Sequence, residues 1–171
     1  MNEINSTQTD EAGNEQGLIS FANSDLFDRL YNEAMQMIRE SANYLELEGV
    51  IERQRAPEKL APIFACESMR LTTRLLQVTA WLLALRALKG GELTAGEYAA
   101  RNYRLGSREV CLGGPVRGAG LLPARLIELL AASRQIYERV SRLDELLFND
   151  AGQGANPVNA HLNRIEQAFA S

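Results

Sequence analysis

Apolar residues recur at intervals of three and four positions along most of the chain, which is the period of an amphipathic α-helix. The first such run begins after Asn23-Ser24-Asp25, a capping group with an acid in the first turn. Its apolar positions are Phe27, Leu30, Tyr31, Ala34, Ile38 and Leu45. We therefore predict a first helix that Gly49 ends, followed by a charged connector over residues 50–61.

A longer helix is predicted from Pro62 to Lys89, because Pro suits a first helical turn and Gly90-Gly91 ends the run. One apolar stripe of this helix contains Phe64, Leu71, Leu75, Val78, Leu82 and Leu85, and a second, nearly opposite, contains Met69, Thr72, Leu76, Ala80 and Leu83. A helix that is apolar on two sides must be covered twice. The pattern predicts a central helix or a homodimer seam, and we favour a homodimer with Met69, Leu76 and Leu83 at its interface.

Between the two stripes lies a narrow line of larger polar and aromatic residues, spaced three and four apart: Glu67, Arg70, Arg74, Gln77 and Trp81. One interpretation is an amphipathic edge on which arginine stems cover apolar neighbours and Glu67 pairs with Arg70. The other is a partner-binding surface, since Arg and Trp are favoured as interface anchors and arginine suits docking to acidic partners. Both interpretations stay open at this stage.

The second half of the chain contains a short helix, a loop and another long helix. Thr94 and Glu97 form a capping box that opens a shorter helix, with Tyr98, Asn102, Leu105 and Val110 along it. Residues 112–120 are rich in glycine and predict a loop. The last long helix opens at Pro123 and carries apolar residues at near-heptad spacing as far as Leu147.

The two ends of the chain differ from this helical pattern. Residues 1–20 are polar and acidic, and we predict a disordered leader. Residues 149–171 form a flexible linker and a short amphipathic peptide whose apolar positions include Leu162, Ile165 and Phe169. That peptide either docks on its own bundle or binds a partner's groove. The predicted fold is all-α, with three long helices in a bundle over residues 21–148 and a short additional helix.

Charge and hydropathy limit the possible partners. The formal net charge is −4, and the acidic leader alone accounts for it, so no basic excess favours nucleic acid or an anionic membrane. The apolar stretch without a charge from Leu75 to Leu85 is much shorter than the roughly 20 residues of a membrane span. Because the first residues lack the pattern of a signal peptide, we expect a cytoplasmic protein.

Candidate catalytic chemistry is sparse. The only histidine, His161, lies in the tail, and the glycines of residues 113–118 lack the lysine and preceding strand of a phosphate loop. Asp144 and Glu145 are neighbours that we place on a solvated helix face. Cys66 and Cys111 have no metal or redox spacing, and we expect both to pack as small apolar side chains. We therefore expect no catalytic, metal or cofactor site.

Three segments carry a resemblance to a known family. They are SDLFDRLYNEAMQMIRESANYL at residues 24–45, ACESMRLTTRLLQVTAWLLALRAL at 65–88, and LPARLIELLAASRQIYERVSRLDELL at 122–147. The tail NPVNAHLNRIEQAF adds to them. The sequence resembles the alphaproteobacterial regulator of CtrA degradation (RcdA-like) family over about residues 20–169, and the run SMRLTTRL followed by a Trp-containing apolar helix is the most specific part.

The resemblance implies a homodimeric helical bundle without catalytic activity. Family members act as adaptors: a response-regulator-like protein primes the ClpXP protease, and the adaptor ties substrates such as cell-cycle transcription factors to that assembly. We accordingly expect as partners a second copy, the primed ClpXP protease and substrate proteins, which could concentrate the protein at a cell pole. The alternative is a dimeric helical scaffold or localisation protein without a proteolytic role.

Overall fold

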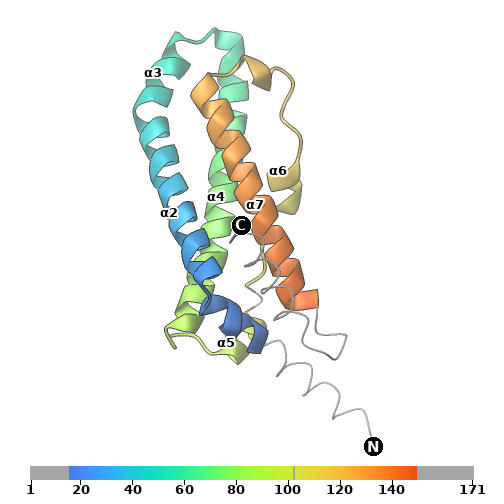
Figure 1. Cartoon of the computed structure of the whole chain (residues 1–171). Helices are drawn as coiled ribbons and strands as arrows, with labels where there is room; N and C mark the ends of the chain where they lie inside the picture. Colours follow the sequence, from blue (N-terminus) through green and yellow to red (C-terminus); the bar gives the residue numbers. More distant parts are fainter. Residues whose placement is uncertain (1–15, 102, 150–171) are drawn as a thin grey trace, which may run out of the picture. The chain divides into compact units, whose positions relative to one another are not determined.

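The structure, a computed structural model, describes residues 16–101 and 103–149 and is helical throughout its regular elements (Figure 1). After a helical segment at residues 16–22 come α2 (Asp25–Glu46), α3 (Glu48–Arg55), the 3-10 turn η1 (Glu58–Leu60), α4 (Ala61–Lys89), α5 (Ala95–Ala100), α6 (Arg108–Leu112), the 3-10 turn η2 (Ala119–Leu121) and α7 (Ala124–Asn149). The predicted all-α class is confirmed, with α2, α4 and α7 as the three long helices. No described residue forms a strand.

The described residues divide between two compact units. The first unit contains residues 16–31, 81–104 and 141–149, with Asn102 undescribed, and the second contains residues 32–80 and 105–140. Each long helix contributes residues to both units. Each unit has its own buried side chains.

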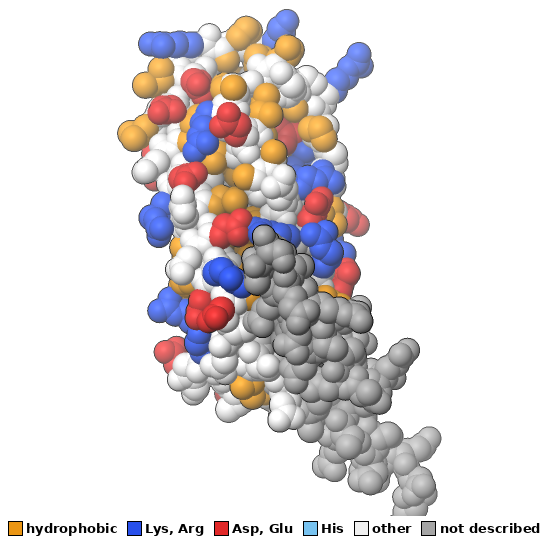
Figure 2. All heavy atoms as spheres, in the orientation of Figure 1, with side chains coloured by type: hydrophobic (Ala, Val, Ile, Leu, Met, Phe, Trp, Pro, Cys, Tyr) orange, Lys and Arg blue, Asp and Glu red, His pale blue; other side chains and the backbone are white. Residues whose placement is uncertain are grey.

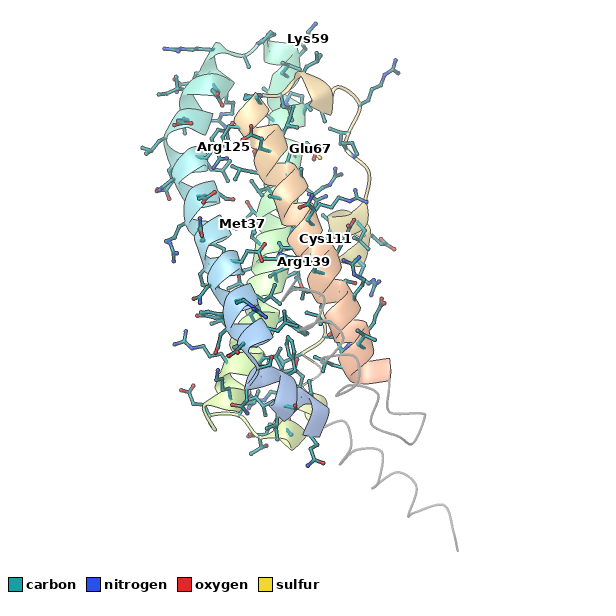
Figure 3. All side chains as sticks on the ribbon, in the orientation of Figure 1. Met37, Lys59, Glu67, Cys111, Arg125 and Arg139 are labelled. Carbon is teal, nitrogen blue, oxygen red and sulfur yellow. The ribbon has the colours of Figure 1, made fainter. Side chains whose placement is uncertain are left out.

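In the second unit, α2, α4 and α7 lie side by side (Figure 1). Their core contains Tyr44, Phe64, Leu71, Leu75, Ala119, Leu122, Leu126 and Leu129. Two arginines of α7, labelled in Figure 3, pair with acids of α2: Arg125 with Glu40 at 3.2 Å, and Arg139 with Glu33. Burial of the apolar side chains supplies most of the stabilisation, because pairs this exposed contribute at most about 1 kcal/mol each.

In the first unit, aromatic side chains from distant segments pack together. The Phe21 ring lies 5.9 Å from Trp81 and 6.0 Å from Phe27, measured between ring centroids. Lys89 pairs with Asp28 at 2.9 Å, and its ammonium group also lies over the Phe27 ring. Such ring and cation contacts add to the burial of apolar area.

Two predicted helix caps are confirmed. The Ser24 hydroxyl accepts a hydrogen bond from the Phe27 backbone N–H at 3.2 Å, as an N-cap of α2 should. At α5, the Glu97 carboxylate accepts from the Thr94 backbone N–H at 2.9 Å, and the Thr94 hydroxyl accepts from the Glu97 N–H at 3.2 Å. This reciprocal pair is the predicted capping box.

The predicted boundaries are wrong in two places. Residues 16–20 are helical and Leu18 is buried, so the predicted leader extends too far into the chain. Gly49 does not end helical structure, because α3 begins at Glu48 and replaces most of the predicted connector. A Cβ at position 49 would lie 2.9 Å from the Tyr44 carbonyl oxygen, so glycine permits a close approach here instead of stopping the helix.

The predicted short helix after Thr94 is two helices. It breaks between α5 and α6, where Ser107 has a positive φ of 57° and the Gly106 backbone N–H donates to the Gln77 side chain. Cys111 is buried as predicted, but Cys66 is exposed, and both thiols are free. The predicted amphipathic tail lies outside the described residues.

Candidate functional site

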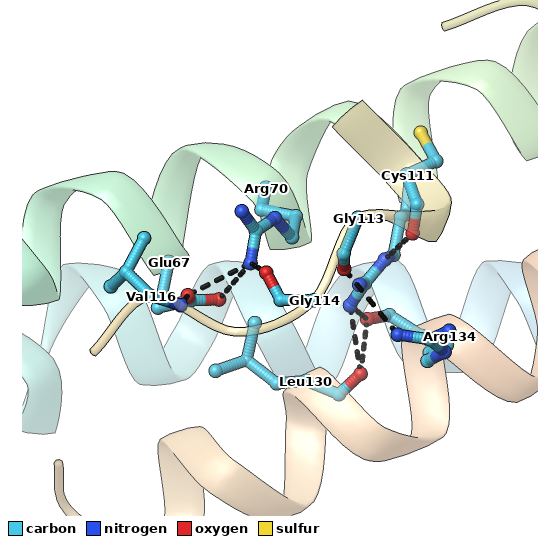
Figure 4. A network of polar contacts seen from close by, with 10 residues as sticks. Glu67, Arg70, Cys111, Gly113, Gly114, Val116, Leu130 and Arg134 are labelled. Carbon is cyan, nitrogen blue, oxygen red and sulfur yellow. Dashed lines mark hydrogen bonds and ion pairs between the residues drawn. The ribbon is translucent and has the colours of Figure 1, made fainter. Parts of the chain in front are cut away.

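Glu67, on α4, is the acidic member of the predicted polar line and is buried. Its carboxylate accepts hydrogen bonds from Arg70 Nη1 at 2.8 and 3.1 Å and from the Val116 backbone N–H at 2.7 Å (Figure 4). The predicted pairing of Glu67 with Arg70 is confirmed. The carboxylate also holds the glycine-rich loop that contains Val116, because it accepts a hydrogen bond from a backbone N–H of that loop.

The two arginines of the line also bind backbone carbonyls. Arg70 Nη1 donates to the Gly114 oxygen at 2.8 Å (Figure 4). Arg74 Nε donates to the Cys111 oxygen of α6 at 2.7 Å, and its Nη1 donates to the Leu130 oxygen of α7 at 3.0 Å. Arg74 therefore joins three helices of the second unit through carbonyl groups.

Gln77 and Trp81 complete the line. Gln77 Oε1 accepts from the Gly106 backbone N–H at 3.0 Å. Trp81 belongs to the first unit and is buried, and its indole N–H donates to Asp144 at 2.9 Å. Asp144 is itself buried and pairs with Arg104 at 2.9 Å, so our placement of Asp144 on a solvated face is wrong.

The prediction of a partner-binding surface is wrong for Glu67, Arg74 and Trp81, which are at most 3% exposed and bind their own chain. Arg70 and Gln77 are half-buried and also bind the backbone of the 106–114 segment. One sequence signal for this outcome was available. A loop rich in glycine exposes many carbonyl groups that need donors, and arginine is the side chain with the most donors.

Burial and neighbouring charges perturb this region. Burial lowers the pKa of the Arg74 guanidinium, and the positive charges of Arg134 and Arg70 lower it further. Burial also raises the pKa of the Cys111 thiol. In the first unit, burial and then the charge of Asp144 raise the pKa of Tyr98. Burial is the first cause of all three shifts.

The predicted dimer residues have the opposite placement. Met69, Leu76 and Leu83 are 71%, 63% and 46% exposed, whereas every member of the opposite apolar stripe of α4 is buried. The hydroxyls of the neighbouring Thr72 and Thr73 donate to helix carbonyls at 2.9 and 2.8 Å, so they need no outside partner. We call Met69, Leu76 and Leu83 the exposed stripe of α4.

Other surface features supply little chemistry. Basic and acidic side chains are interspersed over the face seen in Figure 2. Within the described residues, no three His, Cys, Asp or Glu side chains gather as metal ligands, and no helix has the length and apolar character of a membrane span. The predicted partner-binding residues Leu162, Ile165 and Phe169 lie outside the described part of the chain.

Comparison with known proteins identifies the family. Residues 19–169 match the family described as "Protein of unknown function (DUF1465)". The crystal structure of RcdA from Caulobacter crescentus CB15 is 38% identical in sequence, with a TM-score of 0.61 over 76% of this chain and 97% of that one. This chain belongs to the RcdA family. A search of the curated proteins found no match.

Family membership explains which parts of the sequence carried the resemblance. The match begins at residue 19, shortly before α2, and extends through α4 and α7 to residue 169. It therefore includes the tail residues Leu162, Ile165 and Phe169 and leaves out most of the acidic leader.

Proposed function

We propose that this protein is a non-enzymatic adaptor that tethers substrate proteins to the ClpXP protease, together with a response-regulator-like priming adaptor. The observation that carries the proposal is its 38% identity to RcdA across 97% of the RcdA chain. The resemblance to the regulator of CtrA degradation family implies this adaptor role. The class of substrate that we expect is cell-cycle transcription regulators.

Tethering suits the chemistry of the described residues. An adaptor needs binding surfaces but no nucleophile or general base, because the protease breaks the peptide bonds. Holding a substrate beside the protease raises its effective concentration, so weak contacts on two partners are enough to accelerate degradation. The interior polar groups of this chain serve the fold, and the exposed stripe of α4 and the tail remain as candidate contact surfaces.

We assign the exposed stripe of α4 to a second copy of the chain. Its three residues, Met69, Leu76 and Leu83, recur every seven positions, which is the spacing at which two helices pack along a common seam. These large apolar side chains are 46–71% exposed, and a partner that covers them lowers the free energy because it removes apolar surface from water. We assign the tail peptide with Leu162, Ile165 and Phe169 to a partner protein.

A reconstituted degradation assay tests the adaptor role. Purified ClpXP, a response-regulator-like primer and a candidate client are incubated with full-length protein, with a chain that lacks residues 157–171, or with neither. We expect rapid client loss only with the full-length chain. Degradation that is unaffected at every adaptor concentration would contradict the proposal and favour the dimeric scaffold or localisation role.

Point variants give the tail a sharper test. Ile165→Asp places a charge at an apolar position of the tail, and Asn163→Asp adds the same charge at a polar position two residues away. We expect Ile165→Asp to slow client degradation and Asn163→Asp to leave it near the wild-type rate. Equal rates for both variants would exclude the assigned role of the tail.

The dimer has its own matched pair of variants. Leu76→Glu places a charge in the exposed stripe, whereas Leu121→Glu changes a leucine of similar exposure on η2. Sedimentation equilibrium should show a monomer for Leu76→Glu and a dimer for Leu121→Glu, with unchanged helicity for both. Unfolding of Leu76→Glu alone would mean that the chain itself covers the stripe.

A further inference from the structure

The second unit contains a cavity of about 270 Å³ beside the polar cluster of α4. Its charged wall consists of Glu67, Arg70, Arg74 and Arg134, and the remaining wall is mostly apolar, with Ala119 from η2 and Ile127 from α7. Three arginines and one glutamate therefore line a small, largely apolar space. Figure 4 shows Glu67, Arg70 and Arg134 around the glycine-rich loop.

The carboxylates of this region are already committed to two of the three arginines. Glu67 pairs with Arg70 at 2.8 Å, and Glu138 pairs with Arg134 at 2.8 Å. Arg74 is 3% exposed, and none of the described acids lies within ion-pair distance of it. A buried charge without a counter-ion is costly, because hydrogen bonds to neutral carbonyls offset only part of its lost hydration.

Some arginine N–H groups around the cavity also have no hydrogen-bond acceptor in the described part of the chain. Arg74 donates through Nε and Nη1 to the Cys111 and Leu130 oxygens and, at 3.4 Å, to the Ser133 hydroxyl, while its Nη2 makes no hydrogen bond to the described residues. The Nε of Arg70 is buried without a partner in the described part of the chain. A planar guanidinium with free N–H groups matches the geometry of a carboxylate.

We propose that this cavity binds a small monocarboxylate, whose anionic group pairs with Arg74 and Arg134 and whose apolar part lies against Ile127 and Ala119. With Glu67 paired to Arg70 and Glu138 paired to Arg134, the three arginines keep one net positive charge. One net charge favours a carboxylate over a phosphate with its charge of −1.5 to −2. The carboxylate comes from a free acid or from the C-terminus of a peptide. This inference stands apart from the proposed adaptor role.

A titration followed by amide chemical shifts tests the site in the full-length protein. The probes are isovalerate, its neutral counterpart isovaleramide, and inorganic phosphate, at constant ionic strength. We expect saturable shifts with isovalerate at the backbone amides of Val116 and residues 130–134, and affinity at least about ten-fold weaker for isovaleramide, since a charge-assisted hydrogen bond is lost. Equal affinity for the amide, tighter phosphate binding, or no saturation would each overturn the proposal.

N-acetyl-glycyl-leucine and its C-terminal amide distinguish the two sources. Saturation by the free-acid dipeptide as well as isovalerate supports a peptide C-terminus as ligand, and saturation by isovalerate alone supports a free acid. Both outcomes support the carboxylate site. Neither measurement involves the protease, so failure of this site would leave the adaptor proposal standing.

Variants locate the binding within the cavity. Arg74→Gln removes the charge of the buried arginine and should abolish the response to isovalerate. Because Arg74 also supports the fold, Ala131→Phe provides a second route: Ala131 is an exposed residue that lines the cavity, and a phenyl ring there would fill it. Ala124→Phe, at an exposed position of the same helix, is its control. Wild-type affinity in Ala131→Phe would overturn the assignment.

Discussion

Each compact unit buries one acidic side chain of the polar interior, but the two carboxylates have different surroundings. In the first unit, Asp144 accepts from Trp81 and pairs with Arg104, which is 34% exposed and reaches water. In the second unit, Glu67 accepts from Arg70 and from the Val116 backbone N–H, with the buried Arg74 about two helical turns further along α4. The acid in the second unit thus lies among positive charges that solvent reaches poorly.

This difference shows that the surroundings of a carboxylate determine how strongly the fold depends on it. An arginine at the surface recovers hydration when its partner is removed, whereas a buried arginine does not. The two units should therefore respond unequally to the same substitution.

The largest expected effect is that of Glu67→Ala. Removing this carboxylate leaves the Val116 N–H without an acceptor and the half-buried Arg70 without its counter-ion, beside the buried guanidinium of Arg74. We expect the free energy of unfolding to fall by about 3–5 kcal/mol, measured by urea denaturation. Glu67→Gln, which keeps an acceptor, should lose less. A smaller loss for Glu67→Ala than for the matching change at Asp144 would contradict the comparison.

Asp144→Ala should cost less, about 2 kcal/mol, because the main penalty is the unsatisfied Trp81 N–H. Arg104 can turn to solvent. The fluorescence of Trp81, the only tryptophan, provides a direct measurement of this unit. Asp144→Asn retains an acceptor for the indole, so its free energy of unfolding should be closer to that of the wild type. Equal losses of unfolding free energy for the two variants would mean that charge, not hydrogen bonding, dominates.

The reaction rates of the two cysteines provide a comparison between the surface and the interior of the second unit. Cys66 is exposed, whereas Cys111 is buried with its thiol pKa raised by burial. Because the thiolate is the reactive form, a thiol reagent should modify Cys66 at least about ten-fold faster than Cys111 at neutral pH. Peptide mass mapping over time measures both rates, with Cys66→Ser as control. Similar rates would mean that the α6 region opens readily.

The smallest effect is expected at the exposed capping box of α5. Hydrogen bonds from the Thr94 N–H and hydroxyl lower the pKa of Glu97. Since the folded pKa lies below the unfolded value of about 4.3, the stabilisation is present above that pH and is lost as pH falls through the folded pKa. The difference in the midpoint of thermal unfolding between wild type and Glu97→Ala should decrease toward zero as the pH is lowered from 7 to 3. A difference that is independent of pH would exclude this linkage.

Local patterns were sufficient for much of the fold. Ser24 and the Thr94–Glu97 pair identify helix starts because a cap is made within four residues. The buried stripe from Phe64 to Leu85 follows from the helical period. The prediction that Gly49 ends the helical structure is wrong, because glycine both ends helices and permits close packing. Only the position of the Tyr44 carbonyl distinguishes the two roles.

The candidate sites were predicted unevenly. The placement of Met69, Leu76 and Leu83 agrees with the predicted second stripe, whose role in dimerisation stays a prediction. The placement of Glu67, Arg74 and Trp81 on a contact surface failed, because their spacing along α4 is equally compatible with an exposed line and with an interior one. Residues far away in sequence, such as Asp144 for Trp81, decide between these possibilities.

The sequence by itself determined the helical class, the positions of the three long helices, two of the caps and the family. Tertiary structure decided which polar side chains are interior: Glu67 meets Val116, 49 residues away, and Arg74 meets Leu130, 56 residues away. The physical reason is the range of the interactions. Helix period and capping depend on neighbours within about one turn, whereas the burial of a charge depends on the carbonyl groups and counter-ions that the folded chain brings to it.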